Sequence, residues 1–267
     1  SVFGGEDLVP PQYGKVFISI KPRNGDFVPN LIKQNIKRSL KRYSVAGIVP
    51  EILDLKYLFI ETNSKVYYNT NLAPSASFVS TKVQRDLTAY AESSELNKYG
   101  ARFKYSRFLK VIDSSHESVT SNITTVEMRR DLRLAISEVA EYAIDFGNEF
   151  HIQSMNGFNI RSSAFRVLNI NTDVYLYDTP DSTGEKGQIS LFSLDEGSST
   201  PVIQRRNVGV IDYKKGRITL DPINIVSGKS KDNVDILEIS ATPESNDIIG
   251  LQDLYLQLDS SFVDMVV

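Results

Sequence analysis

The sequence predicts an α+β protein, and three observations carry that prediction. In the first half, two stretches with apolar residues three and four positions apart alternate with short apolar and β-branched runs. In the second half, short apolar runs are separated by loops rich in Asp, Ser and Gly. The chain has 267 residues. A folded chain of this size buries roughly 75% of the surface that its unfolded form exposes, so a large core is expected.

The first predicted elements are a strand and a helix with two distinct faces. Lys15 to Ile20 is apolar and β-branched, and turn residues from Lys21 to Asp26 end this strand. A helix follows Pro29, because apolar and basic residues separate onto opposite faces at helical spacing. The apolar face carries Ile32, Ile36, Leu40 and Tyr43, and the basic face carries Lys33, Lys37, Arg38, Lys41 and Arg42.

The remaining elements of the first region complete a recognisable order. Residues 55–61 and 65–68 predict two strands joined by a turn at 62–64. Thr81 and Gln84 have capping-box spacing, and the apolar residues that follow predict a helix to about residue 97. Residues 101–112 alternate and predict a strand. The order strand, helix, strand, strand, helix, strand is that of a ferredoxin-like βαββαβ module over residues 15–130, preceded by a linker over residues 1–14.

The second region, residues 131–267, is predicted to be mainly antiparallel β, and a sandwich is one arrangement that fits. Its first segment, residues 131–146, fits both a helical stripe and strand alternation, so its structure is left open. The pattern does not fix the boundary near residue 130, and the region need not be continuous. The predicted strands cover residues 174–177, 188–194, 208–213, 217–220 and 235–241.

The charge is unevenly distributed along the chain. The whole sequence holds 30 basic and 33 acidic side chains, which gives a net charge of −3. Residues 1–130 hold 19 basic and 12 acidic side chains, a net of +7, and residues 131–267 hold 11 and 21, a net of −10. Either the two regions simply differ, or they provide complementary contact surfaces.

The residues available for chemistry are few. The chain contains no Cys, which excludes disulfides, thiol nucleophiles and Cys-based metal sites. Its two imidazoles, His116 and His151, have no metal-ligand spacing and are expected on the surface or in packing contacts. We therefore expect no catalytic, cofactor-binding or metal-binding residues. Gly228-Lys229-Ser230 matches the end of a phosphate loop but lacks its first Gly, so it predicts a turn. Asp253 and Asp259 could form a catalytic carboxylate pair, but the sequence does not show that they lie together, and solvated surface acids are favoured.

The basic helix face allows three interpretations. Lys33, Lys37, Arg38, Lys41 and Arg42 form either a solvated face, a docking face for an acidic protein surface, or a phosphate-binding face. A nucleic-acid partner is the least favoured, because the sequence pI is near 5.6 and the aromatic residues alternate into strands. We take these five residues as the candidate partner interface.

The ends and the apolar content indicate a soluble product and a larger parent chain. No run approaches the ~18–20 apolar residues of a membrane span, and the first ten residues do not have the pattern of a signal peptide. The chain starts without Met and ends in apolar residues, so we expect a portion of a longer protein.

One segment resembles a known family. Residues 3–22 read FGGEDLVPPQYGKVFISIKP. They resemble the GGE-x-x-x-PPQYG-[KR]-VF segment of baseplate wedge proteins from contractile-tailed phages, the baseplate-J-like family. Residues 85–90, 121–124 and 209–218 are also similar to that family, with the closest likeness to a C-terminal portion of the large wedge subunit of T-even-type phages. The Gly and Pro residues of the first segment predict tight turns and close backbone approach.

The resemblance implies a structural role in the virion tail baseplate, after assembly in the host cytoplasm. It implies that copies pair through dimer contacts, link into a ring around the central hub and bind other wedge proteins, and that the ring changes shape to trigger sheath contraction. From the residues we expect no enzymatic activity, no cofactor, and no nucleic-acid or membrane partner. The alternative is a phage protein that binds or hydrolyses carbohydrate through its β region, which predicts paired carboxylates in a cleft; the absence of Trp counts against it.

Overall fold

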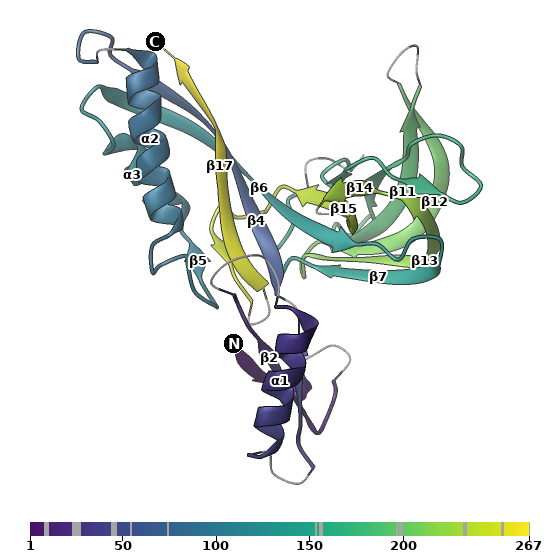
Figure 1. Cartoon of the computed structure of the whole chain (residues 1–267). Helices are drawn as coiled ribbons and strands as arrows, with labels where there is room; N and C mark the ends of the chain where they lie inside the picture. The colour runs from purple at the N-terminus through teal and green to yellow at the C-terminus, as the bar shows by residue number, and fades with distance from the viewer. Residues whose placement is uncertain are drawn as a thin grey trace.

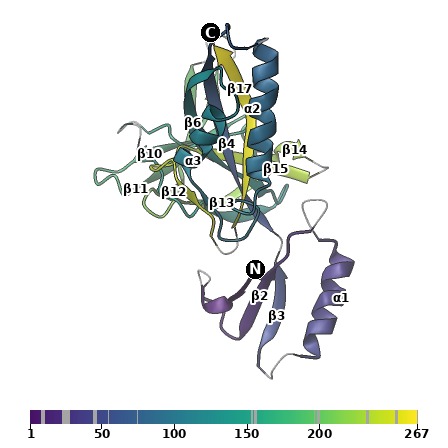
Figure 2. The ribbon, with the colours of Figure 1, turned by 90° about the vertical axis from the view of Figure 1, so that its left-hand side faces the viewer.

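The computed structural model divides the described chain among three groups of elements (Figure 1). In Figure 1 the N-terminal unit (residues 1–53) lies at the bottom, the helical unit at the left and the β unit at the right. Figure 2 shows the N-terminal unit standing apart from the other two in a second view. The structure describes residues 1–7, 11–22, 28–43, 47–53, 55–73, 75–152, 154, 157–195, 197, 200–231, 234–251 and 254–266.

The N-terminal unit is a small sheet with one helix. The sheet order is β1-β2-β3, with β1 antiparallel and β3 parallel to β2. Helix α1 packs against β3. Phe3 and Phe17 stack with ring centroids 5.9 Å apart and are among the buried residues of this unit. The elements are β1 (Val2–Gly4), the 3-10 helix η1 (Gly5–Asp7), β2 (Lys15–Ser19), α1 (Asn30–Lys41) and β3 (Val49–Leu53).

The helical unit is a mixed sheet with two helices on one face. The sheet order is β14-β15-β6-β4-β17, and β17 runs parallel to β4 although the two are almost 200 residues apart in sequence. Helix α2 packs against β17, and α3 packs against α2 and β6. The strands are β4 (Lys56–Tyr68), β6 (Val119–Arg133), β14 (Lys229–Lys231), β15 (Val234–Ala241) and β17 (Leu254–Val266), with β8 (Arg161–Ser162) paired to β15; the helices are α2 (Ala76–Ala91) and α3 (Tyr105–Asp113).

The β unit is built from a second antiparallel sheet. Its order is β10-β11-β12-β13-β7, and β9 pairs with the far end of β13. The strands are β7 (Val139–Asp145), β9 (Arg166–Val167), β10 (Tyr175–Pro180), β11 (Lys186–Leu194), β12 (Pro201–Asp212) and β13 (Arg217–Ser227). A small pair, β5 (Arg102–Phe103) with β16 (Ile248–Ile249), lies beside α3 in the chain.

One hydrophobic core runs through the helical and β units. It joins Leu58 and Met128 of the helical unit's sheet to Phe146 and Ile218 of the β unit, and all four side chains are at most 2% exposed. None of the described residues before β4 belongs to this core. The N-terminal unit therefore has its own small core, while the other two units share one.

The structure confirms the α+β class, and strand content exceeds helix content. The mainly antiparallel β character of the second region is also seen, and its five predicted strands fall on β10, β11, β12, β13 and β15. Strand β12 begins well before the predicted residue 208, and β13 continues well past the predicted residue 220. The segment 131–146, left open by the sequence, ends β6 and forms β7. Division of the chain at residues 14 and 130 stays a prediction, although β1 lies within the first of these segments and β6 crosses residue 130.

Three details of the first region were wrong. Residues 56–68 form one strand instead of a hairpin, because Ser64 and Thr62 bond to the neighbouring strands β6 and β17. Residues 105–113 form a helix instead of a strand, with Phe108 and Ile112 buried on one face. Helix α2 starts at Ala76, because the Ser75 hydroxyl accepts a hydrogen bond from the Phe78 N–H and replaces the predicted cap.

These details also change the ferredoxin-like arrangement expected over residues 15–130. That arrangement requires four strands in one sheet. In the structure β2 and β3 form the N-terminal sheet, and β4 and β6 form a second sheet with β15 and β17. The physical reason is that the strands contributed by the C-terminal part of the chain pair with β4 and β6, so these two strands lie in a different sheet from β2.

Candidate partner interface

Helix α1 has an apolar face that the rest of the chain covers only in part. None of its residues is buried. Ile36 and Leu40 are half-buried, and the helix packs on β3. Ile32 is 48% exposed and Tyr43, just beyond the helix, is 85% exposed. The two ends of the predicted apolar face therefore remain available to another surface.

The five predicted interface residues all lie on this helix or directly after it. Lys37 Nζ lies 4.0 Å from Glu51 Oε1 of β3, and Lys15 Nζ approaches the same oxygen at 3.7 Å. One carboxylate thus faces two lysines beside α1. Among the described residues, Lys37, Arg38, Lys41 and Arg42 are exposed and Lys33 is half-exposed. Their role in partner binding stays a prediction.

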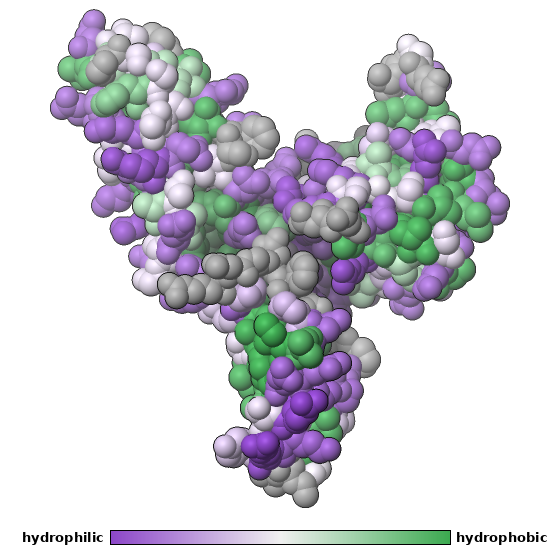
Figure 3. All heavy atoms as spheres, in the orientation of Figure 1, coloured by the Kyte–Doolittle hydropathy of each residue, from purple (hydrophilic) through white to green (hydrophobic). Residues whose placement is uncertain are grey.

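Further exposed apolar side chains lie on α1 and where β3 begins, and the sequence pattern did not single them out. Leu31 is 70% exposed, and Ile48 and Val49 at the start of β3 are 45% and 47% exposed. Figure 3 shows apolar and charged residues adjoining each other on this unit. Large apolar side chains gathered on an exposed surface are typical of interaction sites. The signal that could have predicted them is the small size of this unit, because about 50 residues bury a smaller share of their surface than a larger domain does.

Polar contacts connect the N-terminal unit to the helical unit. Lys21 Nζ donates to Asn97 Oδ1 at 2.8 Å and lies 4.0 Å from the centroid of the Tyr255 ring. The Tyr99 hydroxyl donates to Ser19 Oγ at 3.5 Å. Lys21 and Asn97 are exposed, so water competes for this contact. The two units are therefore joined by a small polar contact.

The Gly-rich segment that resembles the phage family makes a tight turn. Gln12 N–H donates to the Gly5 carbonyl at 2.8 Å. A Cβ on Gly5 would lie 1.9 Å from the Gln12 carbonyl oxygen, so only Gly fits there. Gly14 adopts φ of 74°, and its carbonyl accepts from Val49 N–H at 2.9 Å. The close backbone approach expected from the sequence is confirmed; residues 8–10 of this segment lie outside the described residues.

In the sheet of the helical unit, the face opposite α2 and α3 carries a network of ion pairs. Arg129 donates to Glu61 at 2.5 Å and to Asp131 at 3.0 Å, and its guanidinium lies 4.5 Å from the Phe59 ring centroid. Burial raises the pKa of Glu61; Arg129 opposes this rise, and nearby carboxylates led by Asp259 add to it. Asp259 lies on β17, whereas its predicted partner Asp253 is outside the described residues.

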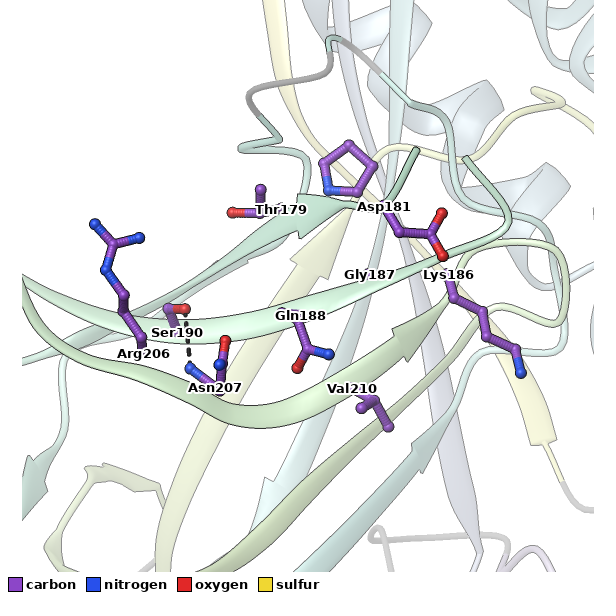
Figure 4. Close-up of a pocket in the computed structure, with 10 residues that line it drawn as sticks. Thr179, Asp181, Lys186, Gly187, Gln188, Ser190, Arg206, Asn207 and Val210 are labelled. Carbon is purple, nitrogen blue, oxygen red and sulfur yellow. Dashed lines mark hydrogen bonds between the residues drawn. The ribbon is translucent and has the colours of Figure 1, made fainter. Parts of the chain in front are cut away.

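The face of the β10-β11-β12 sheet has a shallow hollow of about 340 Å³ (Figure 4). In Figure 4 the side chains of Lys186 and Arg206 lie at opposite sides of the hollow, and Asn207 lies beside Ser190. Asp181 is the one carboxylate among the described residues that line it. Hydrogen bonds from Thr183, first its hydroxyl, lower the pKa of Asp181 and fix it in a turn. This hollow gives no support to glycan hydrolysis, which uses two carboxylates.

The two histidines make local contacts. The ring of His116 packs edge-on against Phe78 at 5.6 Å, and its Nδ1 lies 2.8 Å from Ser118 Oγ. His151 Nδ1 lies 2.8 Å from a carboxylate oxygen of Glu244 on the surface. Within the described residues no three His, Asp or Glu side chains form a group suited to a metal ion. Gly228 separates β13 from β14, but Lys229 and Ser230 belong to strand β14, so the turn predicted at Gly228-Lys229-Ser230 is wrong.

The fold and surface together describe an α+β protein, mostly β, that presents a basic and apolar helix to solvent. No helix in the described part of the chain has both the length and the apolar character needed to cross a membrane. These features define the class of the molecule as a mostly β, α+β protein whose N-terminal unit exposes basic and apolar side chains.

Comparison with known proteins is more specific. Residues 1–53 match the family described as baseplate structural protein gp6, C-terminal domain I, and residues 56–131 match baseplate structural protein gp6, C-terminal domain III. A stretch of 171 residues, 62% of the chain, is 30% identical to baseplate wedge protein gp6 of Enterobacteria phage T4. The matched stretch spans 26% of the length of that relative. These matches support a baseplate wedge structural protein of a contractile phage tail, located in the virion.

The boundary between the two matched segments agrees with the structure. The first match ends at Leu53, the last residue of β3, and the second begins at Lys56, the first residue of β4. The chain therefore changes from one sheet to another where one matched family ends and the next begins. The matches do not test the baseplate-J-like assignment, which stays a prediction.

Proposed function

We propose that this chain is a structural subunit of a phage tail baseplate wedge. In this proposal it associates with further copies into a ring around the central hub and docks other wedge proteins. The observation that carries the proposal is the pair of adjacent matches to two domains of one baseplate protein, whose boundary falls between two sheets of this chain. The relative's name, baseplate wedge protein, supports the same role.

The surface of the N-terminal unit supports self-association. Its exposed apolar residues provide area that gains stability on burial, at roughly 25 cal/mol per Å². The basic residues of α1 lie beside that area and favour an acidic partner surface. Residues 131–267 of the same chain carry a net charge of −10, so a second copy supplies such a surface. We therefore propose a contact between the basic face of α1 in one copy and the acidic region 131–267 of another copy.

The connection between units supports the proposed change of shape. Large interfaces hold units rigidly, whereas small polar ones permit relative motion. The contacts of Lys21 with Asn97 and Tyr255 are of the second kind. We propose that the N-terminal unit reorients against the helical unit when the ring changes shape to trigger sheath contraction.

The experiment is sedimentation of the purified chain over a range of protein and salt concentrations. We expect reversible association that weakens with salt, and weaker association of the variant Lys37→Glu/Arg38→Glu/Arg42→Glu. A matched control reverses three exposed lysines elsewhere, Lys110, Lys214 and Lys215. Association that ignores both salt and the α1 variant overturns the electrostatic contact, and a strictly monomeric chain at high concentration overturns self-association.

The proposal includes no enzymatic activity and no cofactor, nucleic-acid or membrane partner. The rival function, carbohydrate binding or hydrolysis by the β unit, requires a cleft with suitable side chains. The hollow of Figure 4 offers Asp181 alone as a carboxylate among its described lining residues, and that group is bound in a turn. Release of sugar from cell-wall glycan by the purified chain would favour the rival.

A further inference from the structure

The ends of β11 and β12 form an arm (residues 193–194 and 201–207) in which Ser193 alone is buried and the other residues are exposed. Figure 1 shows these strand ends rising above the rest of the β unit. All seven residues from Pro201 to Asn207 are exposed, although they belong to a regular strand. Val202 is 46% and Ile203 is 43% exposed, and these neighbours point to opposite faces of the strand. Both faces of the arm therefore present apolar side chains to solvent.

The arm has an open strand edge. Along β12, only Gly209 to Asp212 pair with β13, so residues 201–207 pair with β11 alone among the described strands. Asn207 adopts φ of 55°, and its N–H donates to Ser190 Oγ at 3.3 Å. This left-handed residue lies where the β11–β12 register shifts, and it directs the arm away from the sheet. Because β10 pairs with β11 as far as Phe192, which lies opposite Ile203, the arm is a two-stranded ribbon only beyond that pair, at residues 193–194 and 201–202. A free two-stranded ribbon is only marginally stable in water, which favours a partner that covers it.

The same chain has a second open edge with the opposite charge. Strand β17 ends its sheet and pairs only with β4 among the described strands. Its sequence from Leu254 to Val266 includes Asp259 and Asp264 and no Lys, Arg or Pro, the residues that block strand addition at edges. Asp264 is exposed between the half-buried Val263 and Met265. The arm carries Arg205 and Arg206 and no acidic residue from Thr200 to Ile211.

We propose that the arm of one copy adds as a strand to the β17 edge of a second copy. Backbone hydrogen bonds between the two open edges supply affinity, and the apolar side chains of the arm are buried against the partner. The arginines of the arm lie beside Asp264 and fix which edge is chosen. Because the two surfaces differ, the contact runs head to tail, and it closes into a ring or continues as a chain of copies. This inference rests on the proposed self-association and assigns it a second contact, separate from α1.

Cross-linking tests the contact directly, because the chain contains no Cys. Val202→Cys and Val263→Cys each place one thiol at an edge with little change in volume. A short bismaleimide is expected to join the two variants when they are mixed, and to give no dimer with either variant alone. Dimers of Val202→Cys alone would show that arms pair with arms and would overturn the proposal, as would the absence of a mixed dimer at concentrations where the chain associates.

Charge exchange separates this inference from the proposed function. Arg205→Glu/Arg206→Glu and Asp264→Arg are each expected to weaken association about tenfold, and their combination in one chain is expected to restore it. Circular dichroism and the thermal midpoint check that each variant folds. If these variants associate like the wild type while the α1 variant does not, the arm contact is overturned and the proposed function stands. A chain that never associates overturns both.

Discussion

Lys21 and Asn97 join two units of this protein through one hydrogen bond, 2.8 Å from Nζ to Oδ1. Lys21 follows β2, and Asn97 follows α2. The Lys21 ammonium also lies over the ring of Tyr255, and the hydroxyl of this Tyr donates to the same Asn97 oxygen. This exposed cation, together with the Tyr99–Ser19 hydrogen bond, therefore connects the N-terminal unit to the helical unit.

Replacing Lys21 by Met is expected to loosen the N-terminal unit while costing little stability. The hydrogen bond and the cation–π contact together contribute about 1–2 kcal/mol to holding the two units together, and Lys21 is outside the core whose loss dominates urea unfolding. Small-angle scattering of the monomeric fraction should show a broader distribution of distances, with the urea midpoint almost unchanged. Lys110→Met, which removes an exposed lysine from α3, is the control. Identical scattering from the Lys21 variant and the wild type would contradict this role.

Replacing Gly5 by Ala is expected to disrupt the N-terminal turn. The added Cβ would lie 1.9 Å from the Gln12 carbonyl oxygen, so the Gln12-to-Gly5 hydrogen bond must break. We expect a loss of at least about 2 kcal/mol in the N-terminal unit. Faster hydrogen exchange at β2 with unchanged exchange at β6 would report it.

The adjacent Gly4 provides the matched control. A Cβ on Gly4 would meet only the flexible side chain of Glu6, at 3.1 Å. Gly4→Ala should therefore leave exchange at β2 close to that of the wild type. Equal effects of the two substitutions would show that the turn does not depend on the close approach at Gly5.

Glu61 is expected to make stability fall as pH rises above its ordinary pKa near 4.5. Burial raises the pKa of Glu61 in the folded state, so the folded chain binds more protons than the unfolded chain above that pH. Glu61→Gln resembles the protonated wild type and lacks this titration. The free energy of unfolding of the variant should match that of the wild type at low pH and gain on it as pH rises.

Urea unfolding at several pH values between 4 and 8 measures this difference. Asp221→Asn, at an exposed carboxylate of β13, is a suitable control. A wild type that instead gains stability over Glu61→Gln with rising pH would mean that the ion pair with Arg129 outweighs burial, and that the pKa of Glu61 is lowered.

Tyr213 is expected to stabilise the β unit through a buried carboxylate. Its hydroxyl donates to Asp178 Oδ2 at 2.6 Å, and the Ile160 N–H donates to Asp178 Oδ1 at 2.7 Å. Tyr213→Phe leaves Oδ2 of a fully buried Asp without this donor. We expect a loss of about 2–3 kcal/mol at pH 7, measured by urea unfolding. Tyr13→Phe, at a hydroxyl-bearing ring that is 80% exposed, should cost almost nothing.

Tyr213 and Asp178 are also expected to make stability depend on pH in the alkaline range. Burial and the bond to Asp178 raise the pKa of Tyr213 far above its ordinary value of 10.0. The folded state then holds a proton that the unfolded state releases, so wild-type stability falls as pH rises past 10. Tyr213→Phe should lack that part of the decline. A parallel decline in both proteins would contradict the raised pKa.

The sequence predicted those elements whose pattern is local. β2, α1 and the strands β10 to β13 follow from alternation, turn residues and helical spacing. At the start of α3, Phe103 and Tyr105 are two residues apart, which is strand spacing. Tyr105, Phe108 and Ile112 have helical spacing and share one face of α3. The competing periods overlap in so short a segment that the neighbours α2 and β6 decide the outcome.

Elements that depend on distant partners were not predictable in this way. Thr62 and Ser64 favour a turn by composition, yet both are at most 2% exposed in the middle of β4. Their hydroxyls find partners in Asp259 of β17 and Thr124 of β6. The basic face of α1 was predictable as a helix face, whereas the exposure of its apolar residues depends on how little the rest of the N-terminal unit covers.

The parallel pairing of β17 with β4 also sets the order in which the molecule can be completed. During synthesis β4 emerges almost 200 residues before the strand that lies beside it. Until β17 is made, the β4 edge that later pairs with it is open, and the Thr62 hydroxyl lacks its Asp259 partner. Such long-range pairing slows folding and prolongs the lifetime of an aggregation-prone intermediate with an open strand edge. The sheet of the helical unit can therefore be completed only after Leu254–Val266 of β17 has been made.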